Sequence, residues 1–176
     1  MSSKKYRRDY RLIEHVDERG RVKAESVYCG EHYLFSAGTE KAKASLKVIL
    51  TWAVISMISF LISLLPYSTA SRTMFVMLPY LFSALPLWML ISSVVRLLKK
   101  EDLEQKDADF ANNRIPACCL WLMILPGLSM IGEICTILLK HERFLQGDLV
   151  FLVCAALLFT GASVCFSRRK DIAAEK

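Results

Sequence analysis

The stretch VILTWAVISMISFLISLL, residues 48–65, decides the fold, because it holds no charged side chain. Its length of about 18 residues approaches the ~20 residues that a helix needs to cross the ~30 Å hydrocarbon core of a bilayer. Three further runs have the same character: Met74–Val95, Ile115–Leu139 and Leu149–Phe166. Only Glu133 carries a formal charge within the four runs. The pattern predicts an all-α membrane protein, built as a bundle of four transmembrane helices.

Polarity divides the chain of 176 residues into three parts. Residues 1–43 are mostly polar and are expected to form a cytoplasmic N-terminal region with a β-hairpin. Residues 44–167 hold the apolar runs and are expected to form the transmembrane domain. Residues 168–176 form a basic cytoplasmic tail. The expected spans cover approximately residues 46–66, 73–98, 115–139 and 148–166.

Two segments of the N-terminal region have strand composition. Tyr10–Val16 and Arg21–Phe35 are rich in Tyr, Val, Ile and Leu, and Asp17–Gly20 between them is a turn signal. We therefore predict a β-hairpin whose second arm continues as a third short strand, Glu31–Phe35. A lone two-stranded hairpin is only marginally stable in water. We expect this one to lean on the membrane surface, on residues Ala108–Arg114 or on a partner.

Local signals predict where the helices begin, end and bend. Thr39 is expected to cap the first helix, and Pro66 is expected to end it because proline cannot continue the backbone hydrogen bonding. Pro79 and Pro86 in the second run predict a bent or locally opened helix. Pro126, followed by glycine, predicts another bend at the middle of the third helix.

The distribution of basic residues predicts the orientation. Of the 23 Lys and Arg residues, 20 lie on the side of the two termini and only three lie in the two connections on the opposite side. The positive-inside rule then places both termini in the cytoplasm, and we expect the cell membrane as the location. The net charge of +6 follows from this signal and from attraction to anionic lipids, so no nucleic acid is needed to explain it. The charged connection Lys99–Asp109 is expected to extend the second helix as solvated surface.

Glu133 is the most specific candidate for a functional side chain, because an ionisable residue inside a span is costly. Ser129, Glu133 and Thr136 share one face of the third helix. This candidate intramembrane polar site lies about 9 Å past the helix centre, near the outer interface. It is expected either to bind a cation or proton or to be a structural ion pair with Arg72, Lys140 or His141. The absence of a second acidic residue from the other apolar runs argues against a proton relay.

Small residues mark two candidate helix-packing faces. Ser56, Ser59 and Ser63 line the first helix, and Gly161 lies on a narrow face of the fourth. Small side chains at such spacing let transmembrane helices approach closely. The six cysteines form no C-x-x-C pair and are read as small apolar packing residues. We expect no disulfide, metal or cofactor, and the common hydrolase and nucleotide-binding motifs are missing.

These observations favour a non-enzymatic membrane subunit or accessory protein. Its larger polar surfaces belong to the side that carries the termini, and they suit a protein partner or a second copy of the chain, beside the lipid bilayer itself. The alternative is a small transporter or channel component that uses Glu133 for a cation or proton.

Overall fold

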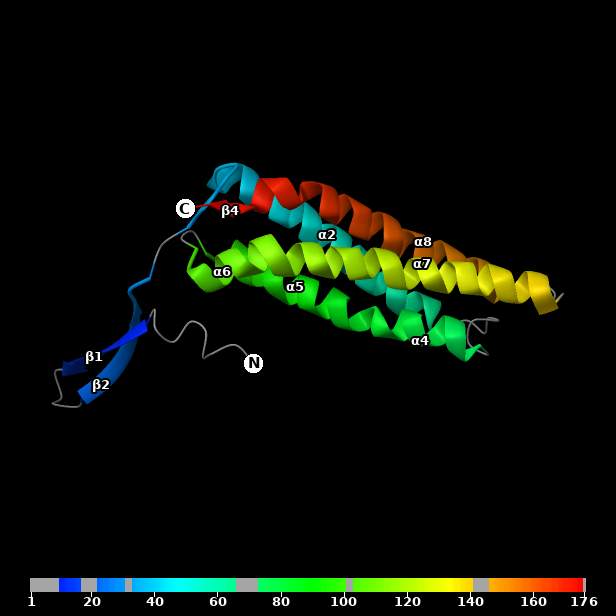
Figure 1. Cartoon of the computed structure of the whole chain (residues 1–176), viewed down its shortest axis with the longest axis horizontal. Helices are drawn as coiled ribbons and strands as arrows, with labels where there is room; N and C mark the ends of the chain where they lie inside the picture. The colour runs from blue at the N-terminus through cyan, green and yellow to red at the C-terminus, as the bar shows by residue number, and fades with distance from the viewer. Residues whose placement is uncertain are drawn as a thin grey trace.

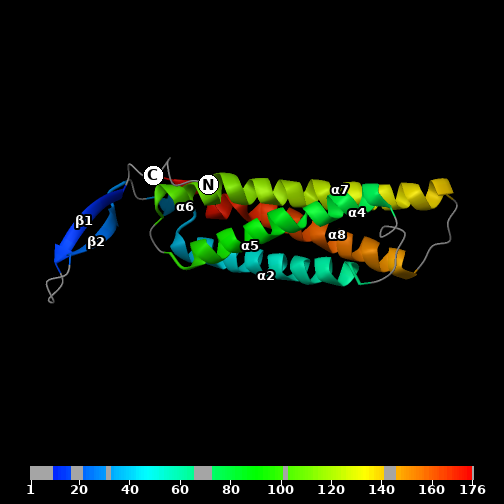
Figure 2. The same ribbon diagram turned by 90° about the horizontal axis from the view of Figure 1, so that it is seen from below.

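The computed structural model describes residues 10–16, 22–30, 33–65, 73–100, 103–140 and 146–175, with the backbone alone for residues 10–28 and 140. Most of this structure is helical. Within the described residues, four helical segments are long and apolar enough to cross a membrane. They lie alongside one another in one elongated bundle (Figures 1 and 2). The predicted four-helix architecture is therefore confirmed at the level of its elements.

The four spans consist of eight helical elements and breaks between them. The first span is α2 (Thr39–Ser63), and the second is α4 (Met74–Phe82) followed by α5 (Ala84–Leu98). The third comprises α6 (Gln105–Asp109), the π-helical turn η2 (Phe110–Arg114) and α7 (Ile115–Lys140). The fourth is α8 (Gln146–Ser167), which the 3₁₀ turn η3 (Arg168–Ile172) extends.

The bundle has two distinct ends. One end lies beside the β-hairpin, and we call it the hairpin end (Figure 1). It contains the starts of α2 and α6 and the ends of α5 and α8. α2 ends, α4 begins, α7 ends and α8 begins at the opposite end, which we call the far end (Figure 2). Successive spans are therefore antiparallel.

The second span is interrupted at Ser83, between α4 and α5. Pro86 explains the position, because its ring clashes with the carbonyl of Phe82, four residues earlier, and it has no N–H to donate there. At this break Ser83 donates two hydrogen bonds to the carbonyl oxygen of Tyr80. Its hydroxyl lies 2.5 Å and its backbone nitrogen 3.1 Å from that oxygen. By contrast, α7 passes through Pro126 without interruption and is drawn as one almost straight helix (Figure 1). The expected local opening occurs in the second span, whereas the third shows no break.

The charged connection does not extend the second helix, contrary to the sequence-based expectation. α5 ends at Leu98 with Lys99 as its cap, and the third span begins at Gln105, earlier than the expected residue 115. The charges explain this boundary. Lys99 and Lys100 lie at the negative end of the α5 dipole, and Glu104 precedes the positive end of α6, so each group favours a helix terminus at its own position.

The predicted hairpin is present. β1 (Tyr10–Val16) pairs antiparallel with β2 (Val22–Tyr28), in a register that places Tyr10 opposite Tyr28. The turn residues 17–20 lie outside the described residues. The expected third strand does not continue this hairpin. Instead β3 (Leu34–Phe35) pairs with the C-terminal strand β4 (Ala174–Glu175).

A glycine turn leads from β3 into the first span. Gly38 is the residue before α2, with φ 83° and ψ 152°, and its backbone nitrogen donates to the carbonyl of Phe35 at 3.0 Å. This backbone conformation is open essentially to glycine alone. Thr39 is therefore the first residue of the helix and not its cap. The other end of α2 lies at Ser63, and Pro66 is outside the described residues.

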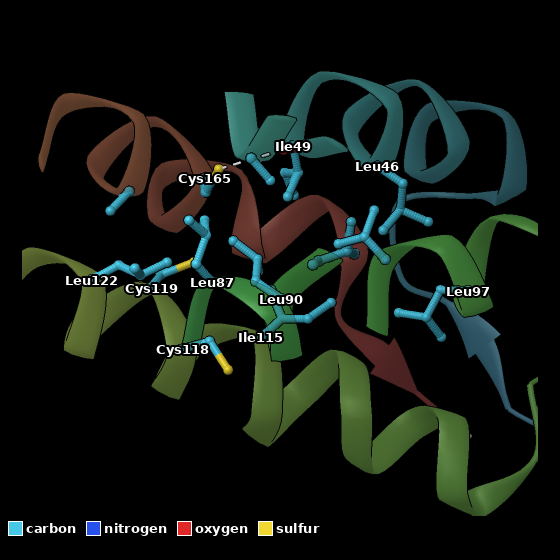
Figure 3. Close-up of a cluster of buried hydrophobic side chains, with 14 of the residues drawn as sticks. Leu46, Ile49, Leu87, Leu90, Leu97, Ile115, Cys118, Cys119, Leu122 and Cys165 are labelled. Atoms are coloured by element: carbon cyan, nitrogen blue, oxygen red, sulfur yellow. Dashed lines mark hydrogen bonds between the residues drawn. The ribbon is translucent and has the colours of Figure 1, made fainter. Parts of the chain in front are cut away.

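The core is apolar and draws on all four spans. Figure 3 shows side chains from α2, α5, α7 and α8 meeting in one cluster. Its fully buried members include Leu46, Ile49, Leu87, Leu90, Leu97, Ile115, Cys119, Leu122 and Cys165. The cysteines Cys118, Cys119, Cys154 and Cys165 are buried free thiols.

Candidate functional site

Glu133 lies inside the bundle, about two helical turns before the far end of α7. Its side chain and that of Ser129 are fully buried, whereas Thr136 is half-buried. The two hydroxyls bond to their own helix: Ser129 to the carbonyl of Leu125 at 3.1 Å and Thr136 to the carbonyl of Gly132 at 2.7 Å. Both hydroxyls are therefore satisfied locally. The side chains of Arg72, Lys140 and His141, the expected ion-pair partners, lie outside the described residues.

A further acidic side chain is buried in the spans, and it was not among the residues counted in the apolar runs. Asp148 lies in the first turn of α8 and is fully buried. The expected span of residues 148–166 begins at Asp148, but the apolar run that was searched for charges begins at Leu149. An acidic residue in the first turn of a helix is favoured by the helix dipole, which agrees with this position at the start of α8. Because α7 and α8 are antiparallel, Asp148 and Glu133 lie toward the same end of the bundle.

Tyr80 is the centre of a buried polar and aromatic contact that joins three helices. Its hydroxyl lies 2.6 Å from the hydroxyl of Ser63 on α2, and Ser63 also donates to the carbonyl of Phe60 at 2.7 Å. The Tyr80 ring lies 5.2 Å from the ring of Phe60 and 4.8 Å from that of Phe151 on α8. We call Phe60, Ser63, Tyr80 and Phe151 the Tyr80 cluster. A tyrosine within an apolar run gave no sign of this role, because the partners lie on other helices.

Two small residues meet at the α2–α8 contact, Ser56 of the first span and Gly161 of the fourth. Ser56, Ser59 and Ser63 are all buried, but Ser63 bonds to Tyr80 on α4 instead. A methyl group added to Gly161 would come within 2.6 Å of the Ser56 hydroxyl oxygen and 3.5 Å of the Trp52 ring. The two helices therefore approach so closely that a side chain at position 161 would require the Ser56 hydroxyl to move.

A charged network at the hairpin end contradicts the expected solvated connection. Asp107 is fully buried and receives hydrogen bonds from Nε of Arg96 at 2.8 Å and from Nζ of Lys100 at 2.7 Å. Lys100 also bonds to Glu104 at 2.9 Å. We call Arg96, Lys100, Glu104 and Asp107 the base network. It connects the end of α5 to the start of α6, and its burial depends on the tertiary fold.

The two acidic partners determine the protonation of Lys100. Burial acts to lower the pKa of this amine, but the hydrogen bonds and negative charges of Asp107 and Glu104 outweigh it, so the pKa is raised above its usual value of 10.5. Lys100 therefore stays charged at neutral pH, and it holds the two carboxylates together.

Backbone hydrogen bonds attach the chain after the hairpin to the bundle. The backbone nitrogen of Tyr33 donates to the carbonyl of Leu103 at 2.9 Å, and that of Leu103 donates back at 3.3 Å. The side-chain amide of Asn112 both donates to the carbonyl of Ala174 and accepts from its N–H, each at 2.9 Å. Asp171 adds a hydrogen bond from Ser45 at 3.0 Å. We call residues 33–38, 103–112 and 171–175 the base platform.

The base platform includes the chain from Tyr33 onward, whereas the hairpin itself stands away from the bundle (Figures 1 and 2). The sequence-based expectation that the hairpin leans on residues Ala108–Arg114 is not supported. That segment contacts the C-terminal strand instead, through Asn112. Within the described residues, no group of three His, Cys, Asp or Glu side chains is placed to hold a metal ion.

No protein-family model matches this chain, and no curated protein or solved structure is significantly similar to it.

Proposed function

We propose that the protein is a multi-pass membrane subunit or accessory protein without enzymatic activity, which binds a protein partner through its hairpin end. Both termini and the base platform would face the cytoplasm, and the cell membrane is the expected location. The basic asymmetry of 20 residues against three supports this orientation. A membrane-impermeant maleimide tests it, because the exposed thiol of Cys29 should react only after the membrane is opened.

The arrangement of the hairpin carries the partner proposal. The base platform bonds to the chain at Tyr33, which follows β2 in the sequence, yet the two strands stand away from the helices. A two-stranded sheet is marginal in water and has unpaired backbone groups along both outer edges. A partner that adds a strand or covers one face would supply the backbone hydrogen bonds or the packing that the bundle does not provide. The partner is therefore expected to contact residues 10–28.

Site-specific photo-crosslinking in cells tests this proposal. A photoreactive amino acid at Tyr10 or Tyr28, which are opposite each other in the sheet, should yield a discrete crosslinked product. The same probe at Ile131, which is exposed on the side of α7, serves as the control for lipid-facing positions. A strictly monomeric protein with no crosslink from either hairpin position would contradict the proposal.

A matched pair of asparagine variants tests whether the base platform positions the hairpin for its partner. Asn112→Ala removes both hydrogen bonds to Ala174, whereas Asn113→Ala removes only an exposed contact with Asp109. We expect Asn112→Ala to reduce the hairpin crosslink and Asn113→Ala to leave it unchanged. Equal crosslinking in both variants would show that the platform does not position the hairpin.

A second candidate function is a small transporter or channel component that uses Glu133. Glu133 and Asp148 are both buried toward the same end of the spans. This second acidic side chain supports the transporter alternative more strongly than Glu133 alone did. The test is a pH-dependent cation or proton flux in proteoliposomes. Glu133→Gln should abolish the flux and leave folding intact, whereas Ser163→Ala, which removes an exposed hydroxyl bonded to its own helix outside this site, should preserve it. An absent flux, or one unchanged by Glu133→Gln, would exclude this function.

A further inference from the structure

An apolar groove of about 470 Å³ lies between the second and third spans. One wall is formed by Phe82, Leu85 and Met89, and the other includes Trp121 and Leu125. Leu85 is 63% exposed and Trp121 is 56% exposed, so the groove opens on the outer surface of the bundle. We call it the α5–α7 groove. In a membrane this surface would face lipid.

The break in the second span shapes this groove. Pro86 interrupts the helix at Ser83 and itself lines the groove, while the small side chain of Ala117 lies in the facing wall. Cys118 also lines the groove, and Figure 3 shows its thiol pointing away from the core cluster. The residues that line the groove therefore belong to helical segments of the second and third spans.

A single cation lines the hairpin end of the groove. Arg114 closes η2 at the start of α7, with its guanidinium carbon 4.9 Å from the centre of the Phe110 ring. Arg96 lies over the same ring at 5.2 Å but is committed to Asp107. Among the described residues, no carboxylate lies within 4 Å of the Arg114 guanidinium. Within the part of the chain that the structure describes, the positive charge of Arg114 therefore has no carboxylate partner and can meet an anion at the groove.

The length of the groove matches one half of a bilayer. From Arg114 to Leu125 the helix rises about 16 Å at 1.5 Å per residue, and the hydrocarbon core of a bilayer is ~30 Å thick. A molecule that places an anion at Arg114 and an apolar chain along the groove would therefore extend from the membrane surface to near its middle. A phospholipid has this distribution of charge and apolar length.

We propose that the α5–α7 groove binds one anionic phospholipid from the leaflet at the hairpin end, with its phosphate on Arg114 and an acyl chain along Trp121. The inference rests on membrane insertion of the four spans and is independent of the proposed protein partner. Failure of the lipid test would therefore leave the hairpin crosslinks unaffected, and the reverse also holds.

Quenching of tryptophan fluorescence by brominated lipids tests the groove directly. A W52F/W88F variant keeps only Trp121 in the groove, and a W52F/W121F variant keeps only Trp88, which is 67% exposed and does not line it. Each is placed in vesicles of phosphatidylcholine and phosphatidylglycerol, with one or the other lipid brominated on its acyl chains. Trp121 should report a preference for phosphatidylglycerol of about fivefold, which is the attraction expected for one basic residue at an anionic surface. Trp88 should report no preference.

Two cation variants separate the groove from general surface charge. Arg114→Gln in the Trp121 protein should reduce the preference to that at Trp88. Lys106→Gln removes a cation from the same end of the bundle that does not line the groove, and it should leave the preference intact. Size-exclusion chromatography and circular dichroism verify that each variant is folded.

Three results would overturn the proposal. The first is equal quenching of Trp121 by the two lipids in the protein with Arg114 intact, which decides the question even if Arg114→Gln does not fold. The second is an equal loss of preference in Arg114→Gln and Lys106→Gln, which would indicate surface charge alone. The third is protection of Trp121 from both lipids, which would show that a second copy of the chain covers the groove.

Discussion

The base network and the Tyr80 cluster both bury polar groups between helices, but they use different chemistry. At the hairpin end Asp107 is fully buried, and its partners Arg96 and Lys100 keep 37% and 28% of their side chains exposed. Inside the spans the Tyr80 cluster uses two neutral hydroxyls and three aromatic rings. Long cationic side chains can reach water from the end of a helix, and so the ion pair avoids most of the desolvation cost. The buried side chains of the Tyr80 cluster do not reach water in this way, and a contact between neutral hydroxyls avoids the cost of burying a charge.

The largest expected effect comes from removing both cations of the base network. Arg96→Gln combined with Lys100→Gln leaves Asp107 buried without a positive charge beside it. Breaking a buried ion pair in this way costs about 3–5 kcal/mol. The unfolding free energy in detergent, measured by denaturant titration, should fall by this amount. Adding Asp107→Asn to the double variant should recover part of the loss, and a further loss would contradict the electrostatic explanation.

A smaller loss is expected from packing at the α2–α8 contact. Gly161→Ala places a methyl group 2.6 Å from the Ser56 oxygen, so the helices or the serine must shift. Overpacking of this kind costs about 1–3 kcal/mol. Gly127→Ala is the matched control, because the nearest atom to its added methyl group lies at 3.9 Å. Thermal unfolding should separate the two variants, and equal midpoints would refute the close approach.

The Tyr80 cluster should tolerate loss of its hydroxyl better than the base network tolerates loss of its cations. Tyr80→Phe keeps the ring contacts with Phe60 and Phe151 and leaves Ser63 bonded to the Phe60 carbonyl. Hydrogen bonds between transmembrane helices average about 0.6 kcal/mol. We expect a loss of this size in the unfolding free energy. A loss as large as that of the double cation variant would remove the distinction between the two regions.

The smallest effect concerns pH and belongs to the base network alone. The pKa of Lys100 is raised on folding, so its stabilising contribution is complete below the usual value of 10.5 and disappears as the pH rises through the raised value. Unfolding should therefore become easier in alkaline solution above that value. Lys100→Arg remains charged there and should flatten the pH dependence. Superimposable profiles of the two proteins would exclude this role for Lys100.

Local sequence predicted the four apolar helices and the β1–β2 hairpin, but not the start of the third span, the partner of β3 or the polar contacts. The apolar runs predicted four spans, and the strand β1 was predicted with the bounds that the structure shows. The burial of Asp107 could not be predicted, because its neighbours along the chain are charged and read as solvated surface. Asp148 was overlooked for a related reason, since it begins the expected span but precedes the apolar run in which charges were counted. Both errors treat a charged side chain as exposed without knowing which helices surround it.

The sequence by itself determined the number of spans, the N-terminal hairpin and the asymmetry of basic charge. These follow from composition within single segments, where length and hydropathy are enough. Only the tertiary structure decided that β3 pairs with the C-terminal strand, that Asp107 lies between Arg96 and Lys100, and that Arg114 lines an apolar groove. Each of these contacts joins residues on different elements, and the pairing of Leu34 with Glu175 connects almost the two ends of the chain. Such contacts depend on how the helices are placed in space, which no local pattern records.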